Sequence, residues 1–279
     1  MDDNLRVTLI NPFSRVEGRG AQENSMIRLP ALNLPKRNIP SGYHVDRASI
    51  SAEPISNAKD CIVVVIYEDL CQLAFISLEE DTTWTYSYAE IQCIQDVVYV
   101  EDKFYAVDIY NKLHSFAVTT QFKWRDVECV AEGFVQECQI MRYLVELNDH
   151  KELLMVQRYI SSKWNRQGKR YRVTTKFEVF KFDADEYKWT KINTLGDVAL
   201  FVGENSSISL LASNFLGCMP NCIYFLHDWD RVPRPTRPRD FGLYSMKTQN
   251  FLPVAGTHAA SLIKMSNLTP IWTVANIKL

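Results

Sequence analysis

The feature that most constrains the fold of this chain is a recurring pair of aromatic residues separated by a short polar turn. In four places an aromatic residue closes a strand-like segment and another opens the next segment seven to nine residues later. This spacing suits an antiparallel hairpin whose paired rings pack across the strands. The four pairs are Phe75 with Trp84, Phe116 with Trp124, Phe182 with Trp189, and Tyr244 with Phe251.

Each hairpin follows a more apolar run, which is typical of a strand buried on both faces. The first three runs recur at intervals of roughly 40 to 50 residues, the length of one propeller blade. The last interval is longer, and we expect the polar stretches 161–171 and 229–240 to be insertions. An ordinary antiparallel sandwich is the alternative that the repeat alone leaves open. The runs are Val63–Tyr67, Phe104–Asp108, Leu153–Val156 and Ile223–Leu226.

These repeats predict an all-β protein, a β-propeller of four-stranded antiparallel blades. The count favours five blades in a single domain that spans residues 1–279, with repeats from about 9 to 274. Strands at 9–13 and 26–29 would begin the first blade, and we leave open whether that blade is complete. We expect a C-terminal strand at 271–274 to join the first blade, because this closure removes exposed sheet edges.

Composition limits the classes of function. Apolar residues make up 47% of the chain and charged residues 23%, which is typical of a globular protein with a sizeable core. A formal net charge of −2 gives no broad positive field, so a nucleic-acid or membrane partner is not favoured. The N-terminus is acidic where a secretory or organellar leader would be basic. We therefore expect a protein of the cytoplasm, the nucleus or both, with reduced cysteines.

No motif points to catalysis or to a cofactor. Patterns for phosphate cradling, dinucleotide binding, zinc hydrolysis and a serine nucleophile are absent. Cys218, Cys222 and His227 lie close together in sequence but lack a fourth ligand for a structural zinc ion. We therefore predict a protein that is not an enzyme and holds no cofactor and no metal. A hydrolytic propeller stays open, because sequence order does not show which side chains converge on a central channel.

Two basic segments are the candidate partner-binding sites. Exposed arginine beside tryptophan or tyrosine is the composition of interface hot spots. Alternating prolines would keep the second segment extended, with its guanidinium groups available to carboxylates. Both segments are expected to be exposed loops, and the alternative is that they are merely solvated and variable. The candidate residues are Lys163, Trp164, Arg166 and Arg170 in the first segment, and Trp229, Arg231, Arg234, Arg237 and Arg239 in the second.

Several longer motifs resemble the KIB-type β-propeller family, which is found in plants mostly behind an F-box. Asn11-Pro12-Phe13-Ser14 is similar to the opening motif of that family. The stretch from Leu195 to Ser207, followed by Gly217-Cys218 and Asn221–Phe225, resembles its longest motif in order and spacing. The segment from Val97 to Asp108 resembles a further motif of the family, and within it Asp102 stands where the family commonly has glycine. The resemblance extends from about residue 9 to residue 274.

The resemblance implies a non-catalytic protein-interaction module, like the substrate-recognition propeller of plant F-box proteins in ubiquitin ligases. Its protein target is unknown. No F-box helices precede Asn11 in this sequence, so binding to a Skp-type adaptor is not expected. An alternative is an F-box-free propeller factor that acts in an organelle or on nucleic acid.

Overall fold

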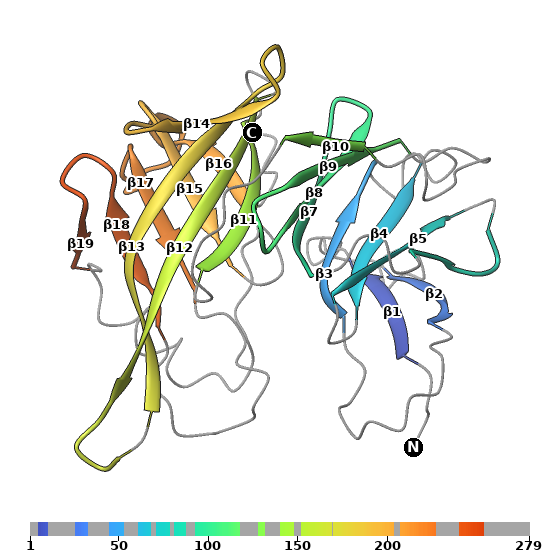
Figure 1. Ribbon diagram of the computed structural model, residues 1–279, viewed down its shortest axis with the longest axis horizontal. Helices are drawn as coiled ribbons and strands as arrows, with labels where there is room; N and C mark the ends of the chain where they lie inside the picture. The colour runs from blue at the N-terminus through green and yellow to red at the C-terminus, as the bar shows by residue number, and fades with distance from the viewer. Residues whose placement is uncertain are drawn as a thin grey trace, which may run out of the picture. The chain divides into compact units, whose positions relative to one another are not determined.

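The regular secondary structure of the described residues is almost wholly β-strand (Figure 1). The computed structural model describes residues 5–10, 26–32, 45–52, 61–67, 71–78, 81–87, 93–117, 128–131, 140–147, 152–168, 170–203, 207–226 and 240–253. Within these ranges the only helical element is a 3₁₀ turn, η4 (Ala212–Asn214). The strands divide into two compact units, one up to Cys93 and one from Ile94, and each is described by itself. The expectation of a single domain stays a prediction.

The first unit contains two antiparallel sheets. One pairs β1 (Leu5–Ile10) with β2 (Met26–Leu32), and the other has the order β3-β4-β5-β6. The core joins them, because Trp84 packs against Leu29 and Leu32 and its Nε1 donates to the Pro30 carbonyl at 2.8 Å. The four strands of the second sheet are β3 (Val45–Ile50), β4 (Ile62–Tyr67), β5 (Gln72–Ser77) and β6 (Thr85–Tyr86).

The second unit begins with two four-stranded antiparallel sheets. The first has the order β10-β9-β8-β7 and the second the order β11-β12-β13-β14. An apolar layer between them includes Leu113, Met155 and Phe180. The strands are β7 (Ile94–Val100), β8 (Lys103–Asp108), β9 (Leu113–Phe116), β10 (Glu128–Ala131), β11 (Ile140–Leu147), β12 (Glu152–Trp164), β13 (Arg170–Asp183) and β14 (Lys188–Ile192).

The last sheet differs from this pattern, because it has five strands in the order β16-β15-β17-β18-β19 and its β15–β17 pair is parallel. The connection through η4 carries the chain from one side of β15 to the other. Its Ala212 N–H donates to the carbonyl of Asp197, and Asn221 N–H donates to that of Val198. The strands are β15 (Val198–Val202), β16 (Ile208–Leu211), β17 (Cys222–Phe225), β18 (Gly242–Ser245) and β19 (Asn250–Leu252).

The all-β prediction is confirmed, and the described strands form five sheets in chain order. The predicted buried runs are β4, β8, β12 and β17, each with a neighbour on both sides. In the described residues the first sheet consists of β1 and β2, and β1 covers 5–10 where 9–13 was expected. Residues 11–13 and the expected C-terminal strand at 271–274 lie outside the described ranges.

Three of the predicted aromatic hairpins are described with both partners; in two of them the rings pair across the strands as predicted, and in the third they are offset by one residue. Phe182 lies opposite Trp189, with ring centroids 5.6 Å apart, and Tyr244 lies opposite Phe251 at 5.2 Å. In the hairpin of β5 and β6, Phe75 lies opposite Thr85, one residue after Trp84. The β9–β10 hairpin is present as well, but Trp124 falls outside the described residues.

Candidate partner-binding site

The first basic segment belongs to a two-stranded ribbon that extends beyond the rest of its sheet (Figure 1). In the described residues, β11 pairs with β12 only as far as Tyr159, and β14 pairs with β13 only from Val179. Between these limits β12 and β13 pair with each other until Trp164 meets Arg170. We call residues 160–174 the β12–β13 arm.

The arm corrects the expectation that 161–171 is a loop. Residues 161–164 and 170–171 are strand, and only Asn165–Gly168 form the turn at the tip. Gly168 has φ +69°, a conformation that a residue with a side chain adopts less readily. Its N–H donates to the Asn165 carbonyl. A ribbon with solvent on both faces needs no apolar alternation, so a run such as Ser161-Ser162-Lys163 reads as loop in the sequence.

A β-bulge separates the arm from the sheet. Tyr159 lies opposite Lys176 and the next residue, Ile160, lies opposite Thr174, which leaves Thr175 as the extra residue. A bulge of this kind bends the strand and increases its twist. The bulge therefore marks the boundary between the arm and the part of the ribbon that pairs within the sheet.

Three of the candidate residues in the arm are exposed. Lys163 and Arg166 are exposed, and Trp164 exposes 70% of its surface. In the strand register Lys163 lies opposite Tyr171, and Trp164 lies opposite Arg170. Residues opposite each other share a face of the ribbon. The fold therefore places a cationic position beside an aromatic one on each face near the tip.

The second basic segment lies outside the described residues. This holds for Trp229, Arg231, Arg234, Arg237 and Arg239. The structure does describe the residues on either side, Leu226 and Asp240. Both are bonded to one buried side chain of β12, Arg158, at the base of the arm.

Arg158 exposes 1% of its surface and donates to groups in or next to β11, β13, β17 and β18. Nη1 reaches the Leu226 carbonyl at 2.7 Å, and Nη2 reaches both the carbonyl and Oδ2 of Asp240 at 3.1 Å. Nε donates to Thr174 Oγ1 at 2.7 Å, and the guanidinium carbon lies 4.8 Å from the centroid of the Phe225 ring. Arg158 thus holds the end of β17 and the start of β18 at the base of the arm.

The carboxylate of Asp240 completes this buried centre. Its Oδ2 accepts the backbone N–H and the hydroxyl of Thr174, each at 2.6 Å, in addition to Arg158. Buried charges are tolerated where they are paired and fully hydrogen-bonded. Sequence reasoning missed this centre. Its only local signal is a single arginine within the apolar run that forms β12.

On the opposite face of β12, the neighbouring residue Gln157 holds the strand in place. This side chain is fully buried, and its Nε2 donates to Asn111 Oδ1 at 2.8 Å while its Oε1 lies 3.0 Å from the Tyr159 hydroxyl oxygen. The Tyr159 hydroxyl also donates to Glu178 Oε2 at 2.5 Å. The base of the arm is therefore held on both faces of the ribbon.

Glu178 sits between two exposed lysines below the arm. Lys191 Nζ lies 2.7 Å from its Oε1, and Lys176 Nζ lies 3.3 Å away and 3.9 Å from the centroid of the Tyr159 ring. Burial alone would raise the pKa of Glu178, but hydrogen bonds from Lys191, Tyr159 and Lys176 lower it below its ordinary value. One carboxylate therefore faces two ammonium groups, on the same face as Lys163.

The remaining described residues offer a histidine–carboxylate contact but no cluster of metal ligands. They hold no group of three or more histidine, cysteine, aspartate or glutamate side chains placed to bind a metal ion. None of their helices is long and apolar enough to cross a membrane. Among the described residues, the contact that most resembles a catalytic acid–base pair is that of His114 with Asp108, 3.3 Å apart. Asp108 Oδ1 also accepts the N–H groups of Tyr110 and Lys112, which is the geometry of a capped turn.

Comparisons with known proteins agree with the fold. The model of a family described as KIB1-4 beta-propeller matches residues 1–245. Putative F-box protein At3g25750 of Arabidopsis thaliana is 25% identical over 192 residues, which cover 66% of this chain and 50% of that protein. F-box protein At4g35733 of the same plant is 27% identical over 199 residues, or 66% of this chain and 51% of that protein. The chain thus spans about half the length of these relatives.

Proposed function

The chain belongs to the KIB1-4 β-propeller family, and from that premise we propose that it recognises a protein target through the β12–β13 arm. The family occurs in proteins named as F-box proteins, which is consistent with a protein-interaction module. The finer proposal is that residues 1–279 perform target recognition of the kind that an F-box ubiquitin-ligase subunit needs. Catalysis is no part of this proposal.

The observation that carries the proposal is the exposure of Trp164 at the end of a ribbon whose base is fixed. Large exposed aromatic side chains with neighbouring cations are enriched among residues that dominate binding energy. Arg158 and Gln157 hold β12 on its two faces six and seven residues before Trp164. An arm ordered before binding loses less conformational entropy when a partner docks.

The charges of the arm favour an acidic target. Lys163 and Arg166 are exposed at the tip, and Lys176 and Lys191 lie below it around a single carboxylate. Opposite charges across an interface speed encounter and set its orientation. We propose the segment with Arg231, Arg234, Arg237 and Arg239 as a second contact, because its flanking residues Leu226 and Asp240 meet at the base of the arm.

Charge reversal at the tip tests the proposal. The chain is used to capture proteins from plant extract, as wild type, as the variant Lys163→Glu/Arg166→Glu, and as the control Lys103→Glu/Lys247→Glu. The control changes the charge by the same amount at exposed lysines outside the arm. Specific captured proteins should be depleted about tenfold or more with the arm variant alone. Equal capture by all three proteins would overturn the proposal.

The same variants test the alternative of a nucleic-acid factor. Cationic and aromatic positions beside each other at the tip could also stack against bases of single-stranded RNA. Binding of a fluorescent oligouridylate that is lost with the arm variant, without any captured protein, would favour this second function. The expectation that residues 1–279 do not bind a Skp-type adaptor stays a prediction, to be tested by direct titration.

A further inference from the structure

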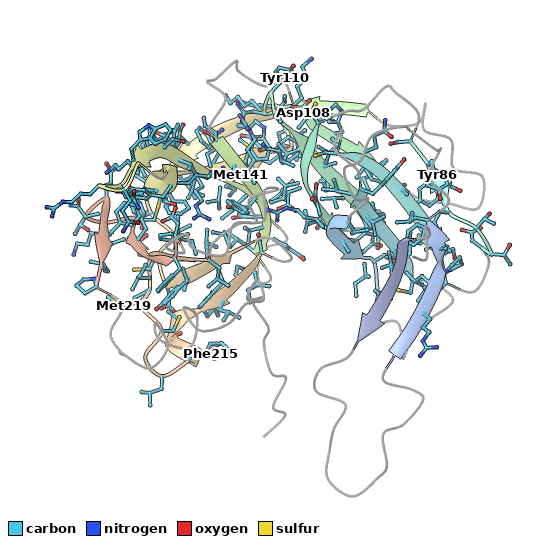
Figure 2. All side chains as sticks on the ribbon, turned by 90° about the horizontal axis from the view of Figure 1, so that it is seen from below. Tyr86, Asp108, Tyr110, Met141, Phe215 and Met219 are labelled. Carbon is cyan, nitrogen blue, oxygen red and sulfur yellow. The ribbon has the colours of Figure 1, made fainter. Side chains whose placement is uncertain are left out.

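A second exposed surface in the last sheet has the opposite chemistry to the arm. Residues 213–220 begin within η4 and lead towards β17, and we call this segment the apolar loop. Leu216 exposes 109% of its reference surface, Met219 44% and Phe215 41%. Figure 2 shows Phe215 and Met219 close together at the outer edge of the second unit. Of the large apolar side chains that are exposed in the described residues, no other three lie within five residues of one another.

The apolar loop is held by hydrogen bonds along its length. Phe215 N–H donates to the Ala212 carbonyl at 3.1 Å, and Cys218 N–H donates to the Phe215 carbonyl at 3.0 Å. Met219 N–H donates to the Tyr224 hydroxyl at 2.9 Å, and the Tyr224 ring stacks on Phe201 with centroids 4.5 Å apart. The exposed side chains are therefore presented by an ordered backbone.

Both ends of the loop are also fixed. Ser213 Oγ donates to Asp197 Oδ2 at 2.5 Å, and Asn221 Oδ1 accepts the Leu195 N–H at 2.8 Å. Gly217 has φ +84°, a left-handed conformation that side chains rarely adopt, so the turn that exposes Leu216 requires glycine. These contacts keep Leu216 in solvent, where an unrestrained loop could fold it back onto the sheet.

The loop and its neighbours in the sequence carry no charged side chains. No lysine, arginine, aspartate or glutamate occurs between Glu204 and Asp228 in the sequence. The charged side chain bonded to the loop is Asp197, an acid. Electrostatic attraction therefore contributes little to whatever binds here, and a negatively charged surface is disfavoured.

We propose that the apolar loop inserts Phe215 and Leu216 into an apolar pocket of a partner protein. This second contact surface is independent of the β12–β13 arm. A convex, ordered, uncharged loop is complementary to a concave apolar site, where the partner surrounds each side chain. Met219 lies beside them and would cover the rim of the pocket.

The geometry argues against two other occupants. A symmetric contact between two copies of the chain would set this convex loop against itself, which leaves no concave site to enclose Phe215 and Leu216. A membrane surface rich in anionic lipid attracts loops that carry lysine or arginine, whereas this loop is bonded to Asp197. Both remain as outcomes that the experiment can return.

The experiment places a photo-crosslinking residue, p-benzoylphenylalanine, at position 216 or, as the control, at the exposed Tyr187 in the turn between β13 and β14. Proteins cross-linked in plant extract at 216 but not at 187 are identified, purified and titrated with the intact chain. Leu216→Glu should weaken binding at least tenfold. Lys163→Glu/Arg166→Glu, which changes only the arm, should leave the affinity at this loop within twofold.

Several results would overturn the proposal. The first is cross-linking at 216 no stronger than at 187, and the second is a purified partner that binds Leu216→Glu as tightly as wild type. Flotation of the chain with phosphatidylcholine or phosphatidylserine vesicles, lost in Leu216→Glu, would assign the loop to membranes. A dimer in analytical ultracentrifugation that Leu216→Glu dissociates would assign it to a second copy. None of these results bears on the arm, so the two proposals fail separately.

Discussion

The two ends of the β12–β13 ribbon have opposite environments although six residues separate them on one strand. At the base, Arg158 is buried and donates hydrogen bonds to Leu226, Asp240 and Thr174. At the tip, Trp164 is largely exposed. The comparison indicates a division of roles, because the base determines where the arm points and how stable the second unit is, whereas the tip is available to a partner. Each prediction below separates these roles.

The largest effect is expected at the base. Arg158→Met removes the partner of Asp240 and leaves a largely buried carboxylate with fewer hydrogen bonds. Breaking a buried ion pair by removing one partner costs about 3 to 5 kcal/mol of unfolding free energy. Lys163→Met at the tip should stay within about 0.5 kcal/mol of wild type. Urea titration of both variants measures the difference, and coincident midpoints would contradict the division of roles.

A tryptophan in the same sheet should show a smaller but clear effect. Trp189 is partly buried, packs on Phe182, and donates from Nε1 to the Asn111 carbonyl at 3.1 Å. Trp189→Ala should cost about 2 to 3 kcal/mol, below the 3 to 5 kcal/mol of a fully buried aromatic. Trp164→Ala is the matched control and should leave the free energy of unfolding unchanged. Equal losses for the two tryptophans would show that the tip is packed in solution.

The acid dependence of stability should depend on Glu178. Its pKa in the folded protein lies below the ordinary value of 4.5, so its ion pairs stabilise the fold above about pH 4.5. That stabilisation is lost as the pH falls through the lowered pKa. Glu178→Gln should therefore cost about 1 kcal/mol or less at pH 7. The difference in unfolding free energy between variant and wild type should shrink as the pH falls. Urea titrations of both proteins between pH 7 and pH 3 check this.

The smallest stability effect is expected for the charge reversal at the tip. Lys163→Glu/Arg166→Glu changes two exposed side chains, so the free energy of unfolding should change by less than about 0.5 kcal/mol. Far-ultraviolet circular dichroism and a urea titration suffice for this test. A marked destabilisation would mean that both side chains support the fold, and their loss of binding would then have no simple interpretation.

The sequence predicted the local and periodic features well. The pairing of Phe182 with Trp189 and of Tyr244 with Phe251 follows from a short polar turn between aromatic residues, which is visible within ten residues. The central strands were visible as continuous apolar runs. These features depend on interactions between near neighbours in the chain, and such interactions leave a direct pattern in the sequence.

Long-range and solvent-exposed features were not predictable in the same way. Arg158 and Asp240 are separated by 82 residues, and nothing in either local sequence names the other. The strands of the arm read as loop because their residues are polar on both faces. Phe215, Leu216 and Met219 would have been assigned to a core by their apolar character. Their exposure depends on the turn at Gly217 and on the crossing from β16 to β17.

The most direct test of the central claim is the affinity of a captured target for Trp164→Ala. The target is first purified from the protein set that depends on Lys163 and Arg166, and it is then titrated by calorimetry against wild type and variant. The account predicts an at least tenfold rise in Kd, equivalent to about 1.4 kcal/mol, with an unchanged unfolding curve. A Kd within twofold of wild type would contradict the claim that the tip of the arm is the contact surface.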